Sequence, residues 1–520
     1  MDTEMTNPTS HLLQQIHVGP GPRDNHFVTD FHPEKRVYIH EQEKFEKFLL
    51  QKCPPNLWPG EAHKTTCPRP ILINKAHQQQ LQDMHDALTA AITNIVERWW
   101  TDVDAHFPER MPLEKCEEDL LQWMEEQVAN KKLPMYRECR GSWRPDFLVE
   151  DTLDETGRAV ERFRITEINA RFSFNAFIIG TIANEGLQDM GVGSNGLKCA
   201  TDPKEVGTLN ITFKEKISDI YQLLNSTLSL FRTDQPLHLL KGKEKGIDIH
   251  MLLHVVHQRF GITPRLITPA DLRLLPRAGS NEYRLCAVVE KNGNALHAPS
   301  AWRTSQGELV EEIYQVGLEL HQSELLALDP EMLRQISLRC FNDFRSILLT
   351  HDKRMLGIVK QELKSLVARS VITRTQAKIL DQGIADTILP GSAELHQLIA
   401  SSQLFPKLRY QFLLKPIRSG KGDGIVFGDE WTSNEWISAL QRQLNSQSVS
   451  GAYVIQRRIV PRLYNLVLTP SGVRVQYPLI GTYLVVHGRL LGLGVWRSSQ
   501  DKICAVSHGG SWLCSVTSQD

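Results

Sequence analysis

The sequence predicts a mixed α/β (α+β) fold built from several domains. Between Leu81 and Trp99, apolar residues recur at spacings of three and four, which is the period of one helix face. Two strand-like segments, 143–150 and 160–169, flank a short turn, and from Tyr410 onward short apolar segments alternate with glycines. The chain has 520 residues. At ~150 residues per domain, this length corresponds to roughly three domains.

Composition and charge exclude several classes of protein. The 59 basic and 60 acidic side chains give a net charge of -1, so the positive excess of nucleic-acid or polybasic membrane binders is missing. No uncharged apolar run approaches the ~18 residues that span a bilayer. The first residues are acidic and polar, unlike a secretory signal. The nine cysteines are scattered without a C-x-x-C pair, and the sequons at Asn210 and Asn225 read as chance matches. We therefore expect a cytoplasmic protein with free thiols and small-molecule partners, no nucleic acid and no membrane.

Four regions follow one another along the chain. Residues 1–140 begin as an irregular arm, rich in Pro and His, around a few short elements, and become mostly helical. Residues 141–230 contain the strand pair. Residues 231–345 alternate short apolar runs with helical stretches, which is typical of a middle α/β domain. Residues 346–520 end in the glycine-separated strands.

Helices are expected at four places. Apolar periodicity predicts them near 81–99, near 117–129 and near 395–404. A longer helical block is predicted from Leu309 to about Val367, because residues 309, 313, 316 and 320 are all apolar at helical spacing.

The strand pair carries a cluster of polar side chains. Alternate residues of a strand share a face, so Arg144 and Asp146 point the same way, as do Glu167 and Asn169. A turn centred between residues 156 and 157 places Asp146 opposite Glu167. Facing carboxylates repel unless a cation lies between them, and hard oxygen ligands suit Mg²⁺. A solvated charged hairpin is an equally good interpretation of this pattern alone.

The segment 412–428 joins an apolar strand to a glycine-rich loop. Backbone N–H groups of such a loop can approach phosphates closely, and lysines add positive charge. The Walker A signature G-K-[ST] is absent, and the spacing is not that of a dinucleotide fingerprint. The alternative is a simple glycine-rich turn. The candidate phosphate-binding residues are Lys415, Gly420, Lys421, Gly422 and Gly424.

A third segment, Tyr453, Val454, Ile455 and Gln456, forms a short apolar strand that turns polar at its end. The edge of such a strand can offer backbone hydrogen bonds to an adenine ring, although an ordinary strand has the same pattern. Two further features stay open. Residues 250, 254 and 257 are histidines that share a helix face, for which a partly buried helix is simpler than a zinc site. Arg171 could bind a substrate carboxylate or phosphate, or pair with an acid.

Together these segments resemble an ATP-grasp ligase with an unusual order. The E-I-N segment at 167–169 precedes the K-P-x-x-x-G-x-G segment at 415–422, whereas the lysine strand usually comes first. This order resembles the circularly permuted ATP-grasp proteins, typified by the synthetase part of glutathionylspermidine synthase. The segments H-D-K-R-M-L at 351–356 and G-T-Y-L-V-V at 481–486, with its continuation to 499, are similar to further elements of that group. No amidase half is recognised in the N-terminal region, 1–140.

The resemblance implies a role for each matching position. The Mg²⁺ ligands are matched by Asp146, Glu167 and Asn169, and the arginines at the transferred phosphoryl group by Arg144 and Arg497. The nucleotide lysines are matched by Lys353 and Lys415. The phosphate lid contains Gly420, Lys421, Gly422 and Gly424, and the adenine segment runs from Tyr453 to Gln456. Arg457 and Arg458 stand where an acidic residue often follows, so the ribose contact is unassigned.

The implied activity is ATP-dependent ligation of a small carboxylic acid, such as an amino acid, to an amine. The cofactors are ATP and Mg²⁺, and the intermediate is an acyl phosphate. By analogy, such stand-alone ligases often serve specialised metabolism. Two alternatives stay open: an ATP-dependent phosphotransferase on the same fold, and a non-catalytic nucleotide-binding protein.

Overall fold

The computed structural model describes residues 12–19, 21, 25–153, 156–157, 159–194, 196–200, 232, 234–243, 246, 248–280, 282–291, 294–295, 300–444, 449, 451–506 and 509–518. The proposed boundary between residues 230 and 231 and both sequons lie outside these residues. Among the helices described, none has the length and apolar character needed to cross a bilayer. All nine cysteines are free thiols, as expected.

The main sheet has six strands and joins two distant parts of the chain. Its order is β25 (Ser511–Leu513), β24 (Trp496–Ser498), β22 (Ile480–Val486), β4 (Ser142–Leu153) and β5 (Ala159–Asn169), with β23 (Arg489–Leu493) paired to β22. All of these pairings are antiparallel. The predicted strand pair is therefore β4 and β5, and the late strand β22 lies directly beside β4.

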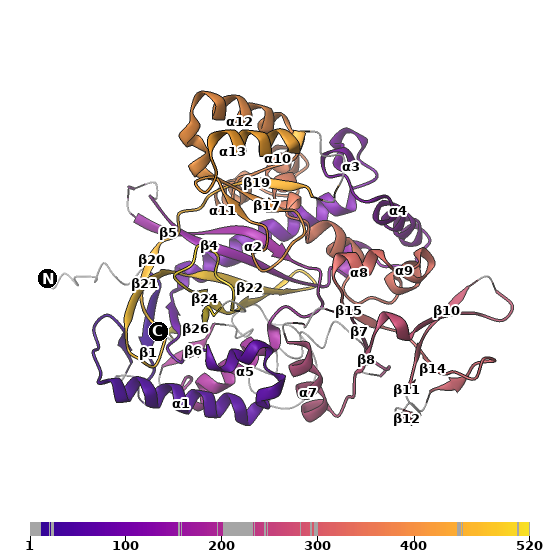
Figure 1. Cartoon of the computed structure of the whole chain (residues 1–520), viewed down its shortest axis with the longest axis horizontal. Helices are drawn as coiled ribbons and strands as arrows, with labels where there is room; N and C mark the ends of the chain where they lie inside the picture. The colour runs from indigo at the N-terminus through magenta and orange to yellow at the C-terminus, as the bar shows by residue number, and fades with distance from the viewer. Residues whose placement is uncertain are drawn as a thin grey trace.

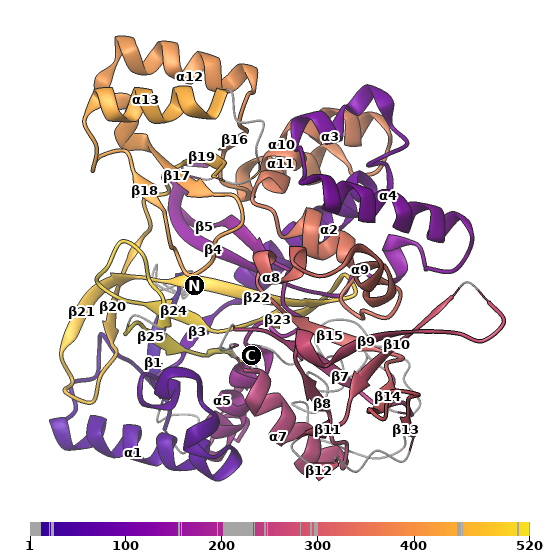
Figure 2. The same ribbon diagram turned by 45° about the vertical axis from the view of Figure 1, so that its right-hand side comes forward.

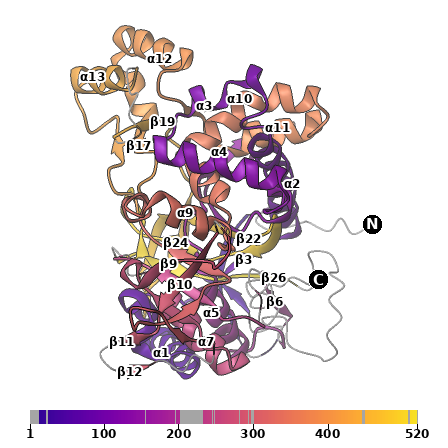
Figure 3. The same cartoon turned by 90° about the vertical axis from the view of Figure 1, so that its right-hand side faces the viewer.

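Helix α2 (Lys75–Glu97) packs near this sheet, together with α10 (Arg354–Ala368) and α11 (Arg374–Gly383). Figure 3 shows the three helices as neighbours. The side chain of Asn74 accepts a hydrogen bond from the backbone N–H of His77 at 2.9 Å and so caps the start of α2. The predicted apolar face is buried, which confirms the periodicity: Leu81, Met84, Leu88, Ile92 and Ile95.

A smaller sheet lies above the main one (Figure 1). Its antiparallel order is β16 (Thr387–Ile388), β19 (Tyr453–Arg457), β17 (Phe412–Pro416) and β18 (Val426–Phe427). Helices α12 (Ala393–Leu404) and α13 (Ser433–Leu444) cover it, and their buried side chains form one cluster with those of the strands. Helix α12 confirms the helix near 395–404, whereas α13 was not predicted.

The middle of the chain forms a parallel sheet of β15 (Val316–Glu319), β7 (His238–Lys241) and β8 (Arg265–Ile267). Helix α7 (Ile249–Phe260) connects β7 to β8 and ends at Gly261, whose φ of 65° suits a left-handed cap. Beside it lies the antiparallel sheet β13 (Trp302–Arg303), β14 (Leu309–Glu312), β10 (Tyr283–Val288) and β9 (Leu272–Pro276), and a small pair, β11 (Glu290–Lys291) with β12 (Asn294–Ala295).

The remaining sheet brings the two ends of the described chain together. Its order is β2 (His26–Phe27), β1 (Gln14–His17), β3 (Ile71–Ile73), β26 (Ser515–Ser518) and β6 (Leu197–Cys199). Helices α1 (Lys35–Lys52) and α5 (Phe177–Asp189) pack side by side near it (Figure 2). The other elements are α3 (Phe107–Arg110), α4 (Lys115–Ala129), α8 (Gln322–Leu326), α9 (Pro330–Ser337) and the hairpin β20 (Leu463–Val467) with β21 (Arg474–Pro478).

Two local predictions were wrong. The arm before residue 70 was expected to be irregular around a few short elements, but α1 spans 18 residues and buries Tyr38, Phe45 and Leu49 on one face. The helical block does not begin at Leu309: residues 309–312 and 316–319 are strands β14 and β15. All four residues of β15 are buried. A strand covered on both faces is apolar almost throughout, so its spacing can imitate a helix.

Candidate active site

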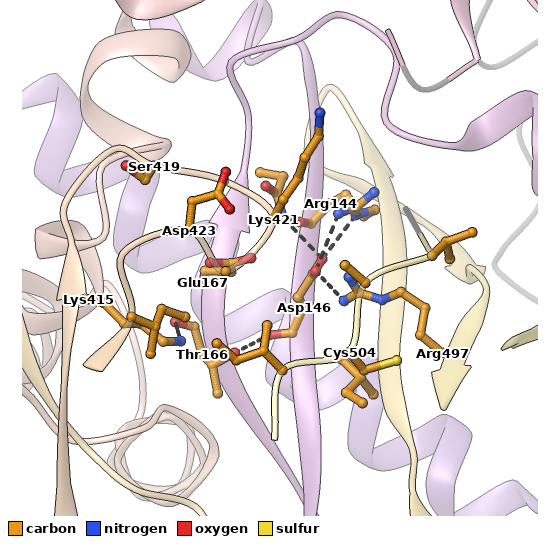
Figure 4. A pocket seen from close by; sticks show the side chains of 18 of the residues that line it. Arg144, Asp146, Thr166, Glu167, Lys415, Ser419, Lys421, Asp423, Arg497 and Cys504 are labelled. Carbon is orange, nitrogen blue, oxygen red and sulfur yellow. Dashed lines mark hydrogen bonds and ion pairs between the residues drawn. The ribbon is translucent and has the colours of Figure 1, made fainter. Parts of the chain in front are cut away.

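A cavity of about 1630 Å³ lies between the main sheet and the smaller sheet. Its walls include residues of β4, β5, β17, β19 and β24, together with the glycine-rich loop after β17. Early and late segments of the chain therefore meet here. Figure 4 shows Asp146 and Glu167 on the sheet, with Lys415 on one side and Arg497 on the other.

The predicted register of the strand pair is confirmed at the site. Arg144 pairs with Asn169, and Asp146 pairs with Glu167. The register shifts directly after Asp146, so Phe147 pairs with Ile165 and Thr166 is the extra residue of a bulge. The bulge turns the carbonyl oxygen of Thr166 into an acceptor for side chains from the smaller sheet, as described below.

Asp146 is the centre of a charged cluster. Its side chain is almost fully buried and accepts hydrogen bonds from Arg144 Nε at 2.9 Å and from Arg497 Nη2 at 2.5 Å. The amide of Asn169 donates to the same carboxylate at 3.1 Å. The Nε atom of Arg497 is buried and has no hydrogen-bond partner within the described part of the chain. A buried, unpaired guanidinium donor is rare in proteins, and an anion in the cavity would supply its missing partner.

Glu167 faces the two lysines. Its carboxylate lies 3.6 Å from the Nζ atom of Lys353. Burial alone would raise the pKa of Glu167, but the charges of Lys353, Lys415 and the nearby arginines outweigh it and lower the pKa to about 2. Glu167 is therefore ionised at neutral pH, as a metal ligand must be.

Lys415 reaches the main sheet from β17. Its Nζ atom donates to the carbonyl oxygen of Thr166 at 3.4 Å, and Gln456 Nε2 donates to the same oxygen at 3.2 Å. Burial lowers the pKa of Lys415 to about 8, although the carboxylate of Glu167 opposes this shift. The bulge in β5 thus connects the two sheets through one backbone carbonyl.

The glycine-rich loop folds over the cavity. Residues Lys421, Gly422 and Gly424 have φ values of 60°, 82° and 77°, which is the left-handed region that glycine adopts without strain. Lys353 Nζ donates to the carbonyl oxygen of Ser419 at 2.5 Å and so fixes the start of the loop. The segment 351–356 and the glycine-rich loop, which the family resemblance assigns to one nucleotide site, are therefore in direct contact.

The adenine segment differs from its prediction in one respect. Strand β19 has partners on both sides, since Gln456 pairs with Leu413 of β17 and with Thr387 of β16. An open strand edge was expected, and β16 fills it at that position. Tyr453 and Gln456 line the cavity, whereas Val454 and Ile455 point their side chains into two apolar cores.

A network of buried charges behind the loop was not predicted. Arg418 donates to Glu117 of α4 at 2.6 Å and to Asp352 at 3.1 Å, and Arg354 Nη2 donates to Asp352 at 2.8 Å. Burial would raise the pKa of Asp352, but Arg354 and Arg418 lower it to about 2. The sequence contains one signal of this network, namely that Arg418 lies inside the glycine-rich segment 412–428. Its partners lie 66 and 301 residues away.

The residues present fit a magnesium site in which the phosphates of a nucleotide supply the remaining ligands. Over the described residues, no cluster of three or more His, Cys, Asp or Glu side chains is placed to hold a metal. The three histidines of α7 therefore form no such group. Asp146 and Glu167 supply two carboxylates and Asn169 an amide oxygen, and Mg²⁺ usually takes one or two carboxylates plus substrate phosphates.

Comparisons with known proteins agree on a family. Residues 84–349 match the family described as the AnkG N-terminal domain. The chain is 34% identical over 454 residues to the ATP-grasp enzyme ankG of Aspergillus thermomutatus, covering 85% of this chain and 87% of that protein. Among solved structures, it is similar to a glutathione synthetase-like effector (GSS30) of Globodera pallida in its apo form. That match has a TM-score of 0.50 and 11% identity, and covers 93% of this chain and 98% of the other, which is a likeness of fold alone.

Proposed function

The chain belongs to the family of the ATP-grasp enzyme ankG, and on that premise we propose that it is an ADP-forming carboxylate–amine ligase. One feature carries this proposal: the early carboxylates of Asp146 and Glu167 line one cavity with the late cations Lys415 and Arg497. Arg497 is 2.5 Å from Asp146, and Lys353 is 3.6 Å from Glu167. Such a cluster can hold a triphosphate and its metal, and an ATP-grasp ligase needs this arrangement.

The fold likeness supports a division of labour along the chain. We propose that residues 141–230 and 346–520 are the metal-binding and nucleotide-binding halves of a circularly permuted ATP-grasp. On this proposal, residues 231–345 are the middle domain, and the described part of residues 1–140 contacts both halves through α1 and α2. The order of the segments supports the permutation, since the strands with Asp146 and Glu167 precede the strand with Lys415.

The reaction proceeds in two displacements. A carboxylate oxygen of the substrate attacks the γ-phosphorus of ATP, and the bond from that phosphorus to the β–γ bridging oxygen breaks, so that ADP leaves. The amine nitrogen then attacks the acyl carbon of the acyl phosphate. The bond from that carbon to the phosphate oxygen breaks, inorganic phosphate leaves, and the nitrogen loses one proton to solvent.

The side chains act mainly by position and charge. Lys353 and Lys415 bind the phosphates of the nucleotide. Arg144 and Arg497, already placed around one carboxylate, contact the phosphoryl group in transfer. Mg²⁺ bound by Asp146, Glu167 and Asn169 would neutralise further phosphate charge. The loop 420–424 covers the site and keeps water from the acyl phosphate.

Replacement of Glu167 by Gln tests the assignment. The amide keeps the shape of the side chain but removes the charge that faces Lys353, so ligation is expected to be abolished while the fold is kept. The assay is ADP and phosphate release with a pooled panel of amino acids and amines, with mass spectrometry of the products. Normal ligation by this variant would refute the role of Glu167.

The same assay, together with thermal melting in the presence of MgATP, separates the alternatives. A phosphotransferase would release ADP and a phosphorylated product without any amine. A non-catalytic nucleotide-binding protein would gain thermal stability from MgATP without turnover. Amine-dependent release of both ADP and phosphate is the result expected of the ligase.

A further inference from the structure

The cavity is larger than a single ligand requires. Ligand pockets usually measure about 300–1,000 Å³, and this one measures about 1630 Å³. Beyond the charged cluster its wall continues onto Phe172, Lys241, His250 and His321, which belong to neither the metal nor the nucleotide segments. We call this part, with Arg171, the basic arm.

The basic arm is built at the carboxyl end of the parallel sheet β15-β7-β8. Lys241 is the last residue of β7, and His321 follows β15 by two residues. Ligands of parallel sheets commonly bind at this end of the strands. His250 lies in the first turn of α7, so a helix N-terminus faces the same space. Three separate elements therefore direct positive charge or N–H groups to one place.

Lys241 is suited to bind an anion. It is half-buried, and the hydrogen bond of its ammonium to a protein atom is a long one, 3.3 Å, to the carbonyl oxygen of Gly242. Within the described ranges it makes no ion pair, although most buried or half-buried cations of the site do. Burial, and secondly the charge of Lys241, lowers the pKa of His250, and both residues line the cavity.

The charge of the whole cavity points the same way. Its described lining contains ten Arg and Lys side chains but only five Asp and Glu. Asp146 and Glu167, two of the five, are already neutralised by the cations beside them. In the basic arm, Arg171 lies over the ring of Phe172, with its guanidinium carbon 4.9 Å from the ring centre, and its Nη1 atom donates to the carbonyl oxygen of Arg418.

The basic arm shares one cavity with Arg144 and the two carboxylates. Asp248, which precedes α7, accepts a hydrogen bond from the backbone N–H of Ile178 at 2.8 Å and so joins the starts of α5 and α7. The guanidinium of Arg144 acts electrostatically on Asp248. Arg144, Lys241 and His250 line the same cavity, so an acid whose reacting carboxylate lies at Arg144 can extend toward Lys241 and His250.

We propose that the acid activated here carries a second carboxylate, and that Lys241, with His250 and Arg171, binds it. The substrate class is a di- or tricarboxylic acid. This inference rests on the proposed ligase function for the identity of the reacting carboxylate. Lys241 is a specificity-determining residue, because it acts on the end of the substrate that does not react.

Hydroxylamine trapping tests the proposal without knowledge of the amine. The nitrogen of hydroxylamine attacks the acyl phosphate and releases phosphate, leaving a hydroxamate that is measured by its iron complex. Succinate and butyrate, each with four carbons, and tricarballylate and hexanoate, each with six, form matched pairs. The diacid or triacid of a pair is expected to give at least about 10-fold higher kcat/KM, the effect of one charge-assisted hydrogen bond.

Lys241→Met removes the charge, and Lys243→Met is the matched control, since Lys243 is exposed and lies outside the cavity lining. Lys241→Met is expected to raise KM for the preferred acid about 10-fold with little change in kcat, and to leave KM for ATP unchanged. Lys243→Met is expected to change neither. Equal use of monocarboxylates, or equal behaviour of the two variants, would overturn the proposal.

A binding measurement separates this proposal from the ligase function. Thermal melting in the presence of MgATP is recorded with tricarballylate and with hexanoate. Stabilisation by tricarballylate that is lost in Lys241→Met supports the basic arm, even if no acid yields a hydroxamate and the ligase function is refuted. Absence of stabilisation by every di- or tricarboxylate in the panel overturns the basic arm, even if monocarboxylates yield hydroxamate.

Discussion

Replacement of Glu117 by Gln tests whether the buried network behind the glycine loop holds that loop in place. Glu117 is 1% exposed and accepts a hydrogen bond from Arg418 at 2.6 Å. Breaking a buried ion pair by removing one partner usually costs about 3–5 kcal/mol. Arg418 keeps Asp352 at 3.1 Å, so the expected loss in the free energy of unfolding is at the lower end, about 3 kcal/mol.

The effect should extend to the nucleotide. Arg418 lies two residues before Gly420, and Glu117 belongs to α4, so the pair fixes the root of the loop to a helix outside the smaller sheet. Loss of one charge-assisted hydrogen bond predicts a rise in the Kd for MgATP of about 10-fold.

Chemical denaturation gives the free energy of unfolding, and isothermal calorimetry gives the Kd. Glu118→Gln is the control, because Glu118 is adjacent in α4 but belongs to neither the buried network nor the cavity lining. A loss below about 1 kcal/mol in Glu117→Gln, no greater than in the control, would refute the role of the pair, since surface substitutions change stability by about 0.5 kcal/mol.

Three further predictions follow from single residues. A triphosphate bound beside Lys415 should raise the pKa of that lysine from about 8, so MgATP binding at pH 8.5 should take up roughly 0.7 proton. Calorimetry in two buffers of different ionisation enthalpy measures this proton uptake. Lys415→Met should abolish the uptake. Burial raises the pKa of Asp248 from 3.8 to about 6, so its stabilising contribution is present below pH 3.8 and is lost as the pH rises through 6. Asp248→Asn should therefore remove up to roughly 3 kcal/mol of the pH dependence of the free energy of unfolding. The raised pKa of Asp248 would be contradicted if the variant and the original protein lost the same stability between pH 4 and 7. Gly422→Ala should weaken MgATP binding, because φ is 82° and the added Cβ would clash with Cγ2 of Ile503. Unaltered affinity by calorimetry would show that the loop adapts.

The sequence predicted best what depends on nearby residues. The facing pair Asp146 and Glu167 followed from strand alternation and the position of one turn, and the structure has that register. The apolar face of α2 followed from spacing in the same way. Both are local properties, decided by residues within the same element or in neighbouring elements.

What the sequence could not show depends on partners far along the chain. Strand β15 imitated a helix because elements on both of its faces bury it. The edge of β19 is occupied by β16, which consists of Thr387 and Ile388. These residues precede both helices that cover the smaller sheet, so they are distant from β19 in the sequence. Arg418 gave no sign that its partner was Glu117. The roles of the site residues remain predictions that the resemblance supplied and that the geometry supports.

The position of β22 beside β4 has a consequence for synthesis on the ribosome. Asp146 pairs with Thr482, so the strand that completes this edge is synthesised long after β4. At about 5–20 residues per second, the nascent chain exposes that edge for tens of seconds. The apolar side chains of Trp143 and Phe147 are then without their final cover. A chaperone that shields strand edges should therefore increase the yield of native protein.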